Sequence, residues 1–207
     1  MEFNSKDLTY IAIVLAIGAV LKLLTDIFTR TILFFLFIDP LLLTSVFLLL
    51  KYPKLKVAIG VAVVQTILGV SLFFATDMWF IRPIIVLICF IFVKIFYKTK
   101  MNIEKKYMYA SFCSSLTTIV MVALVLIGIV LFIPQLFPMQ EVMQQMSVFG
   151  SQLPIESQSL INENAISLIV IALSAMALFF SFIPAFTHMF LAFLISKIFK
   201  IEKHMAK

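Results

Sequence analysis

Long apolar runs separated by short polar stretches dominate the chain. A membrane-spanning helix needs about 20 largely apolar residues, and these runs lack the period of two that marks the strands of a membrane barrel. Helices satisfy their own backbone hydrogen bonds in lipid, so the pattern predicts an all-α membrane bundle. Six transmembrane helices are expected, over Leu8–Thr25, Thr31–Leu50, Val57–Thr76, Trp79–Tyr97, Met108–Ile133 and Ile166–Phe199.

The composition agrees with a membrane protein. Of the 207 residues, 63% are hydrophobic and 13% are charged, and the mean hydropathy is +1.17. A soluble globular domain does not need so much apolar surface. The length fits one domain, so residues 1–207 are predicted to form a single six-helix membrane domain. The last two runs exceed one span and are expected to tilt or project from the membrane.

The distribution of lysines predicts the orientation. Lysines gather after the second and fourth predicted helices and near the C-terminus, whereas residues 134–165 carry three glutamates and no cation. The positive-inside rule then puts both termini in the cytoplasm and predicts a multi-pass protein of the cell membrane. The formal net charge of +6 follows from this topology, so nucleic acid is not an expected partner.

Residues 134–165 are predicted to form a long outer loop with a short amphipathic helix. Within Pro138–Gly150, apolar side chains recur at helical spacing on one face, and the proline and glycine stand at start and stop positions. Two interpretations stay open. The helix lies on the membrane surface, or it forms a methionine-rich lid over an outward-facing pocket.

A few polar residues fall at membrane depth, where charged groups are costly and often functional. Asp39, which precedes Pro40, is either the start or kink of the second helix or a carboxylate that contacts a ligand. Asp77, Trp79 and Arg82 cluster at the outer end of the fourth helix. Trp79 fits an interface anchor, and Arg82 either snorkels to headgroups or pairs with a substrate carboxylate. Asp39, Asp77, Trp79 and Arg82 are the candidate substrate-binding residues.

Two other polar residues in the apolar runs are predicted to be structural. Gln65 is expected to form an interhelical hydrogen bond. His188 has no acidic neighbour in the sequence and is expected to be a satisfied histidine in the inner half of the membrane rather than a proton relay.

Motifs for catalysis are missing from the sequence. There is no phosphate-binding loop, no zinc-protease motif and no nucleophile elbow. Histidine occurs only at positions 188 and 204, so no catalytic metal site is expected. The chain is therefore predicted to be no enzyme and to need no cofactor and no metal.

The first predicted helix has an unusually smooth face. Ala12, Ala16 and Ala19 fall at i, i+4 and i+7, so they share one helical stripe. Small residues at this spacing either allow close packing inside the bundle or form a surface on which another protein docks.

These features together resemble the substrate-binding S component of energy-coupling factor (ECF) transporters. The first helix reads AIVLAIGAV, and Ala12 and Ala16 match the AxxxA motif that contacts the scaffold subunit in that family. The stretch IDPLLLTSVFLLLKYPKLKVAIGVAVVQTILG looks like the family's second helix, basic turn and third helix, with KYPKLK at a turn that often holds glycine.

The resemblance implies a substrate-binding subunit of an importer. It would capture a vitamin-like or aromatic small molecule from outside and dock to a transmembrane coupling subunit and ATPase subunits. The family's pocket opens outward, which would place Asp77, Trp79 and Arg82 around it. Two other function classes stay open: a self-contained secondary permease or channel, and a membrane assembly or regulatory protein without a small ligand.

Overall fold

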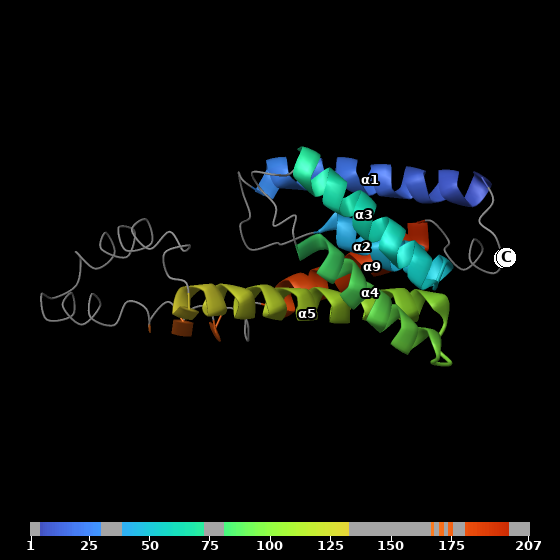
Figure 1. Ribbon diagram of the computed structural model, residues 1–207. Helices are drawn as coiled ribbons and strands as arrows, with labels where there is room; N and C mark the ends of the chain where they lie inside the picture. The colour runs from blue at the N-terminus through green and yellow to red at the C-terminus, as the bar shows by residue number, and fades with distance from the viewer. Residues whose placement is uncertain are drawn as a thin grey trace, which may run out of the picture. The chain divides into compact units, whose positions relative to one another are not determined.

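The computed structural model describes residues 5–29, 39–72, 81–132, 167, 170, 171, 174, 175 and 181–198. Every regular element within these ranges is a helix, in agreement with the predicted all-α class (Figure 1). The helices are α1 (Ser5–Thr29), α2 (Pro40–Lys51), α3 (Leu55–Leu72), α4 (Arg82–Tyr97), α5 (Ile103–Phe132) and α9 (Phe182–Ile198).

The chain divides into two compact units. Unit 1 comprises residues 1–118 and 182–207, and unit 2 comprises residues 119–181. Unit 1 holds α1 to α4, the first part of α5 and α9. In unit 2 the structure describes the rest of α5 and a few helical positions between 167 and 175. The single-domain organisation of residues 1–207 stays a prediction.

Two helices in the described ranges are long and apolar enough to cross a membrane. They are α1, over Ser5–Thr25, and α5. Only 22% and 17% of their most apolar windows are buried, so neither resembles the core helix of a soluble protein. Apolar surface on this scale is rarely left to water, which favours a membrane protein. The six-span topology stays a prediction, because α2, α3 and α9 are apolar but shorter.

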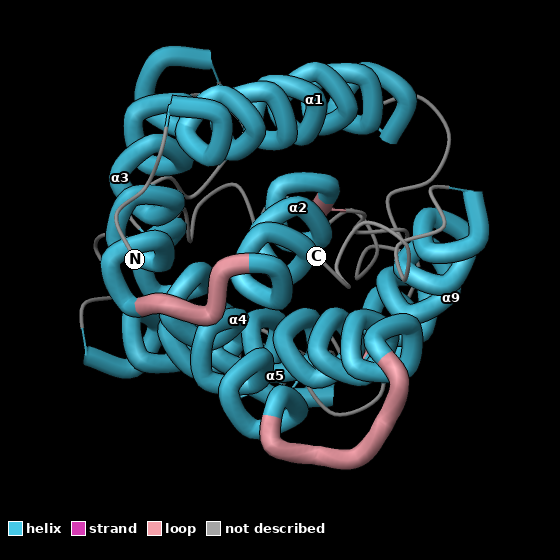
Figure 2. Tube along the Cα trace, turned by 90° about the vertical axis from the view of Figure 1, so that its right-hand side faces the viewer, coloured by secondary structure: helices cyan, strands magenta, loops and turns pink. Residues whose placement is uncertain are grey.

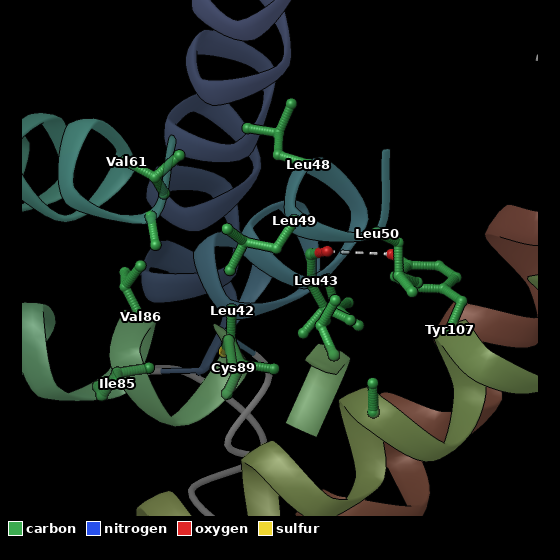
Figure 3. Close-up of a cluster of buried hydrophobic side chains, with 14 of the residues drawn as sticks. Leu42, Leu43, Leu48, Leu49, Leu50, Val61, Ile85, Val86, Cys89 and Tyr107 are labelled. Carbon is green, nitrogen blue, oxygen red and sulfur yellow. Dashed lines mark hydrogen bonds between the residues drawn. The ribbon is translucent and has the colours of Figure 1, made fainter. Parts of the chain in front are cut away.

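Helix α2 is the centre of unit 1. Nine of its twelve residues are buried, and Figure 2 shows α1, α3, α4, α5 and α9 around it. A helix that is apolar on all sides belongs in such a position. Its leucines pack against Val61 of α3, Val86 and Cys89 of α4, and Tyr107 of α5 (Figure 3). The Tyr107 hydroxyl donates to the Leu43 carbonyl at 3.2 Å, which gives this buried phenol a partner.

The small residues of α1 divide between two surfaces. Gly18 approaches α2 so closely that a Cβ atom there would lie 2.7 Å from Thr44 Oγ1, and Ala19 is buried against Leu41. Ala12 and Ala16 are exposed. The stripe predicted from Ala12, Ala16 and Ala19 is therefore not one surface, because Ala19 packs inside the bundle.

Six helix ends meet at one end of unit 1, here called the lysine-rich end. Tyr52, after α2, donates to Asp7 of α1 at 2.8 Å, and Lys197 of α9 pairs with Glu104 of α5 at 3.0 Å. Burial and the bond to Asp7 raise the pKa of Tyr52 to about 12, so its phenol stays a donor at neutral pH. The lysines at this end are Lys51, Lys54, Lys56, Lys94, Lys98, Lys100, Lys105, Lys106 and Lys197.

Two predicted helix boundaries differ from the structure. Helix α2 begins at Pro40 rather than Thr31, and residues 31–38 lie outside the described residues. The run Ile166–Phe199 is not one continuous helix, since a turn at Ser181 precedes α9. Proline suits the first turn of a helix because it lacks the amide hydrogen that an interior position needs. Pro40 and Pro184 both occupy first turns.

Gly18→Ala tests the close contact between α1 and α2. Overpacking usually costs about 1–3 kcal/mol, whereas replacing glycine by alanine inside a helix gains about 1 kcal/mol. The substitution is therefore expected to lower the free energy of unfolding by up to about 2 kcal/mol. Thermal unfolding of the detergent-purified protein measures the change.

The matched control is Gly60→Ala in α3, because a Cβ atom at Gly60 meets no atom of the described residues within 4 Å. This variant is expected to keep or raise the unfolding temperature. Equal stability of the two variants would show that the Gly18–Thr44 contact is not tight.

Candidate functional site

Asp39 occupies the N-cap of α2. Its backbone is extended, and its Oδ1 accepts from the amides of Leu41 at 3.0 Å and Leu42 at 3.4 Å. A carboxylate at a helix N-terminus satisfies orphan amide groups and interacts favourably with the helix dipole. Asp39 followed by Pro40 thus fixes where α2 begins, which confirms the helix-start interpretation of this residue.

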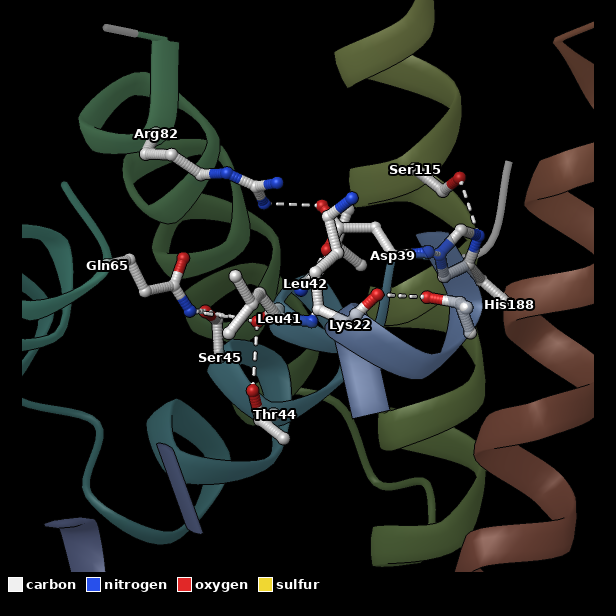
Figure 4. Close-up of polar contacts among 11 residues, drawn as sticks. Lys22, Asp39, Leu41, Leu42, Thr44, Ser45, Gln65, Arg82, Ser115 and His188 are labelled. Carbon is white, nitrogen blue, oxygen red and sulfur yellow. Dashed lines mark hydrogen bonds and ion pairs between the residues drawn. The ribbon is translucent and has the colours of Figure 1, made fainter. Parts of the chain in front are cut away.

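The other carboxylate oxygen of Asp39 binds Arg82. Arg82 Nη1 lies 2.6 Å from Asp39 Oδ2, and the two side chains come from the starts of α2 and α4 (Figure 4). Arg82 is 2% exposed, so it does not snorkel to headgroups. The Asp39 side chain keeps 22% exposure and is therefore the more accessible member of this pair.

His188 of α9 connects to the same residue through its backbone. The Asp39 amide donates to His188 Nε2 at 2.9 Å, and His188 Nδ1 lies 2.8 Å from the Pro184 carbonyl and 3.1 Å from Ser115 Oγ. An amide only donates and a carbonyl only accepts, so the geometry assigns the proton to Nδ1 and leaves Nε2 as the acceptor. Both ring nitrogens are thereby satisfied, as expected for a structural histidine.

Lys22 of α1 completes this group. It is buried, with 8% exposure, and its ammonium attracts the Asp39 carboxylate electrostatically. We call Lys22, Asp39, Arg82, Ser115 and His188 the polar cluster. Its five members come from α1, the start of α2, α4, α5 and α9 (Figure 4), so this one position joins most of unit 1.

Gln65 of α3 lies near the polar cluster. Its Nε2 donates to the Leu41 carbonyl at 2.9 Å and to Ser45 Oγ at 2.6 Å, and both partners belong to α2. The predicted interhelical hydrogen bond of Gln65 is thereby confirmed. Its Oε1 is buried and finds no hydrogen-bond partner within the described ranges.

Hydroxyl groups line the face of α5 that contains Ser115. Ser111, Ser114, Ser115 and Thr118 follow the i, i+3, i+4, i+7 spacing of one helical face. In the part of the chain that the structure describes, the buried hydroxyls of Ser111 and Thr118 have no hydrogen-bond partner. Ser114 lies beside the thiol of Cys89, a weak hydrogen-bonding group. Buried polar groups are usually satisfied, so this hydroxyl face offers unused bonding capacity beside the polar cluster.

Three members of the polar cluster lie at similar distances along their helices from the lysine-rich end. At 1.5 Å per residue, Asp39 is about 18 Å along α2 from Lys51, and Arg82 is about 18 Å along α4 from Lys94. His188 is about 14 Å along α9 from Lys197 on the same basis. The agreement among three helices places these side chains in one layer.

The structure brings together two of the four predicted substrate-binding residues. Asp39 and Arg82 form the ion pair. Asp77 and Trp79 lie outside the described residues, and so does the predicted amphipathic helix of the outer loop. Within the described ranges, no group of three or more histidine, cysteine, aspartate or glutamate side chains could hold a metal ion.

Sequence reasoning missed three contributions to this site. It did not include Lys22, Ser115 or the hydroxyl face of α5 among the candidates, and it found no acidic neighbour for His188. A lone lysine inside an apolar run is a costly residue that could have pointed to Lys22. Hydroxyls at i, i+4 and i+7 could have pointed to α5.

Comparisons with protein-family models, with curated proteins and with solved structures found no match for this chain. The function proposed below therefore rests on the geometry of the described residues and on the resemblance noted in the sequence.

Asp39→Asn tests whether the ion pair holds unit 1 together. Asparagine is also a good N-cap, so the substitution mainly removes the charge that Arg82 and Lys22 attract. Breaking a buried pair from one side typically costs about 3–5 kcal/mol, and a loss of that size is expected on thermal unfolding in detergent.

Glu104→Gln is the matched control, because it removes the carboxylate of the Glu104–Lys197 pair at the exposed end. Exposed pairs contribute about 0–1 kcal/mol. An equally small effect of Asp39→Asn would contradict a structural role for the buried pair.

Proposed function

We propose that this chain is the substrate-binding subunit of an ECF-type importer, and not itself an enzyme. The observation that carries the proposal is the polar cluster, which gathers buried charged and hydrogen-bonding groups from several apolar helices. Ionisable residues at membrane depth are expensive and usually mark a solute or ion site. Energy for uptake would come from separate ATPase subunits through a transmembrane coupling subunit.

The proposed topology has six spans, both termini in the cytoplasm and the chain in the cell membrane. The lysine-bearing helix ends gather on one side of unit 1, which supports a cytoplasmic position for that end. With those lysines at the interface, a layer about 14–18 Å away lies near the middle of a hydrocarbon core of about 30 Å.

The hydroxyl face of α5 supports a small polar ligand. Ser111 and Thr118 flank Ser115 along the helix, and their hydroxyls have no partner within the described residues. A solute with hydrogen-bonding groups would satisfy them, and its apolar or aromatic body would suit the surrounding apolar side chains. This combination fits the vitamin-like or aromatic molecule that the resemblance implies.

The outer face of α1 supports docking to the coupling subunit. Ala12 and Ala16 are exposed, and the exposed neighbours on this helix are large apolar side chains such as Ile13 and Ile17. Small residues permit close approach of a partner helix, which packing in lipid requires. A self-contained permease would need no such partner and would transport its solute in liposomes as an isolated chain.

The double variant Ser111→Ala/Thr118→Val tests the ligand site. No hydrogen bond among the described residues is lost, so the unfolding temperature is expected to stay the same or rise. Vitamins, their precursors and aromatic amino acids are screened by thermal shift, where a hundredfold excess over Kd stabilises by about 2.7 kcal/mol. The shift seen with the unaltered chain should shrink or vanish in the variant.

Ser196→Ala is the control, since the buried Ser196 hydroxyl donates to the Phe193 carbonyl of its own helix. It should keep the ligand-dependent shift. The absence of any shift in the unaltered chain would favour a membrane assembly or regulatory protein without a small ligand.

The double variant Ala12→Trp/Ala16→Trp tests docking. Bulky side chains on this face should keep ligand binding but abolish uptake into cells that contain the coupling and ATPase subunits. The control Ile13→Trp/Ile17→Trp places two tryptophans at exposed positions with the same spacing, about 100° around the helix from the alanine face. This variant should transport normally. Equal loss of uptake in both variants would argue against a docking role for the alanine face.

A further inference from the structure

An apolar groove runs along the outer side of α3 and α4. Its cavity volume is about 520 Å³. Ala58 is buried and Ala62 is partly buried, and these small side chains leave the hollow between larger neighbours, including the half-exposed Ile59 and Val63. Helix α4 contributes Pro83 and Leu87.

The groove has the length of one lipid chain. Its lining extends along α3 from Leu55 to Ile67, which is about 18 Å at 1.5 Å per residue. One leaflet contributes about half of a hydrocarbon core that is about 30 Å thick. The groove begins at the lysine-rich end, because Leu55 is the first residue of α3.

Two cations stand at the lysine-rich end of this groove. Lys56 is exposed and adjoins Leu55. Lys94 is also exposed and lies seven residues after Leu87, so it projects from the same face of α4, about 10 Å further along the helix. Since α3 and α4 run antiparallel (Figure 1), this direction along α4 leads to the start of α3.

We propose that this groove binds an anionic phospholipid. One acyl chain occupies the groove, and the headgroup phosphate lies between Lys56 and Lys94. The apolar lining alone gives no preference for a particular lipid, since lipid tails are as apolar as leucine. Selectivity therefore comes from the lysines, which attract anionic headgroups. The inference requires unit 1 to be inserted with its lysine-rich end at a membrane interface, but it does not require a transported solute.

Native mass spectrometry of the detergent-purified chain tests the site. Palmitoyl-oleoyl phosphatidylglycerol and the matching phosphatidylcholine are added separately, and the retained lipid is counted. One phosphatidylglycerol is expected to be retained in preference to phosphatidylcholine. Lys56→Gln/Lys94→Gln should weaken that binding about 25-fold, at about fivefold for each lysine.

Two controls distinguish binding in this groove from nonspecific attraction of anionic lipid to the lysine-rich end. Lys98→Gln/Lys100→Gln removes the same charge from exposed positions at the same end and should leave the binding nearly unchanged. Ala62→Phe fills the groove and should abolish binding, whereas Val64→Phe, at an exposed position beside it, should not.

Three results would overturn the proposal. Equal weakening by the two lysine pairs would indicate diffuse attraction to anionic surfaces. Retention of phosphatidylglycerol by Ala62→Phe would show that the acyl chain lies elsewhere, and equal retention of both lipids would remove the role of the lysines. If the chain were missing from the membrane fraction of cells, its placement in the membrane would be wrong. A chain that is in the membrane but gives one of the three results above would refute only the lipid site.

Discussion

One Asp39 oxygen caps α2 while the other pairs with Arg82, and the Asp39 amide donates to His188. A single residue thus joins the starts of two helices to the middle of a third. Burying a carboxylate is costly unless it is paired and hydrogen-bonded, and the bonds to Arg82 and to two amides of α2 offset this cost for Asp39. These contacts of Asp39 fix the position of α2, the helix at the centre of unit 1.

Apolar packing alone would not specify such an arrangement in a membrane. Lipid tails are as apolar as the side chains they replace, so helices associate through close packing of small residues and through polar contacts. Unit 1 uses both means. Gly18 brings α1 against α2, and Gln65 joins α3 to α2 by hydrogen bonds. The leucines of α2 fill the remaining space. Apolar contacts have no preferred direction, so the polar groups determine how the helices are placed.

The sequence predicted the helical class and the approximate place of each described helix, because long apolar runs carry that information directly. It also indicated that Asp39 and Pro40 begin a helix. It did not reveal the partner of Asp39, since Arg82 and His188 are distant in sequence and only the packing of three helices brings them together. The sequence also could not show that Ala16 is exposed while Ala19 is buried. The two alanines lie on adjacent parts of one helix surface, and only the position of α2 decides which of them is covered.

The contact between Gly18 and Thr44 has a mechanical consequence. A Cβ atom at Gly18 would lie 2.7 Å from Thr44 Oγ1, so turning α1 about its own axis would bring a larger neighbouring side chain into a gap that suits only glycine. Thr44 lies five residues after Asp39 on a helix that is packed on all sides. The exposed alanine face of α1 and the partly exposed carboxylate of Asp39 are therefore connected through one close contact between α1 and α2.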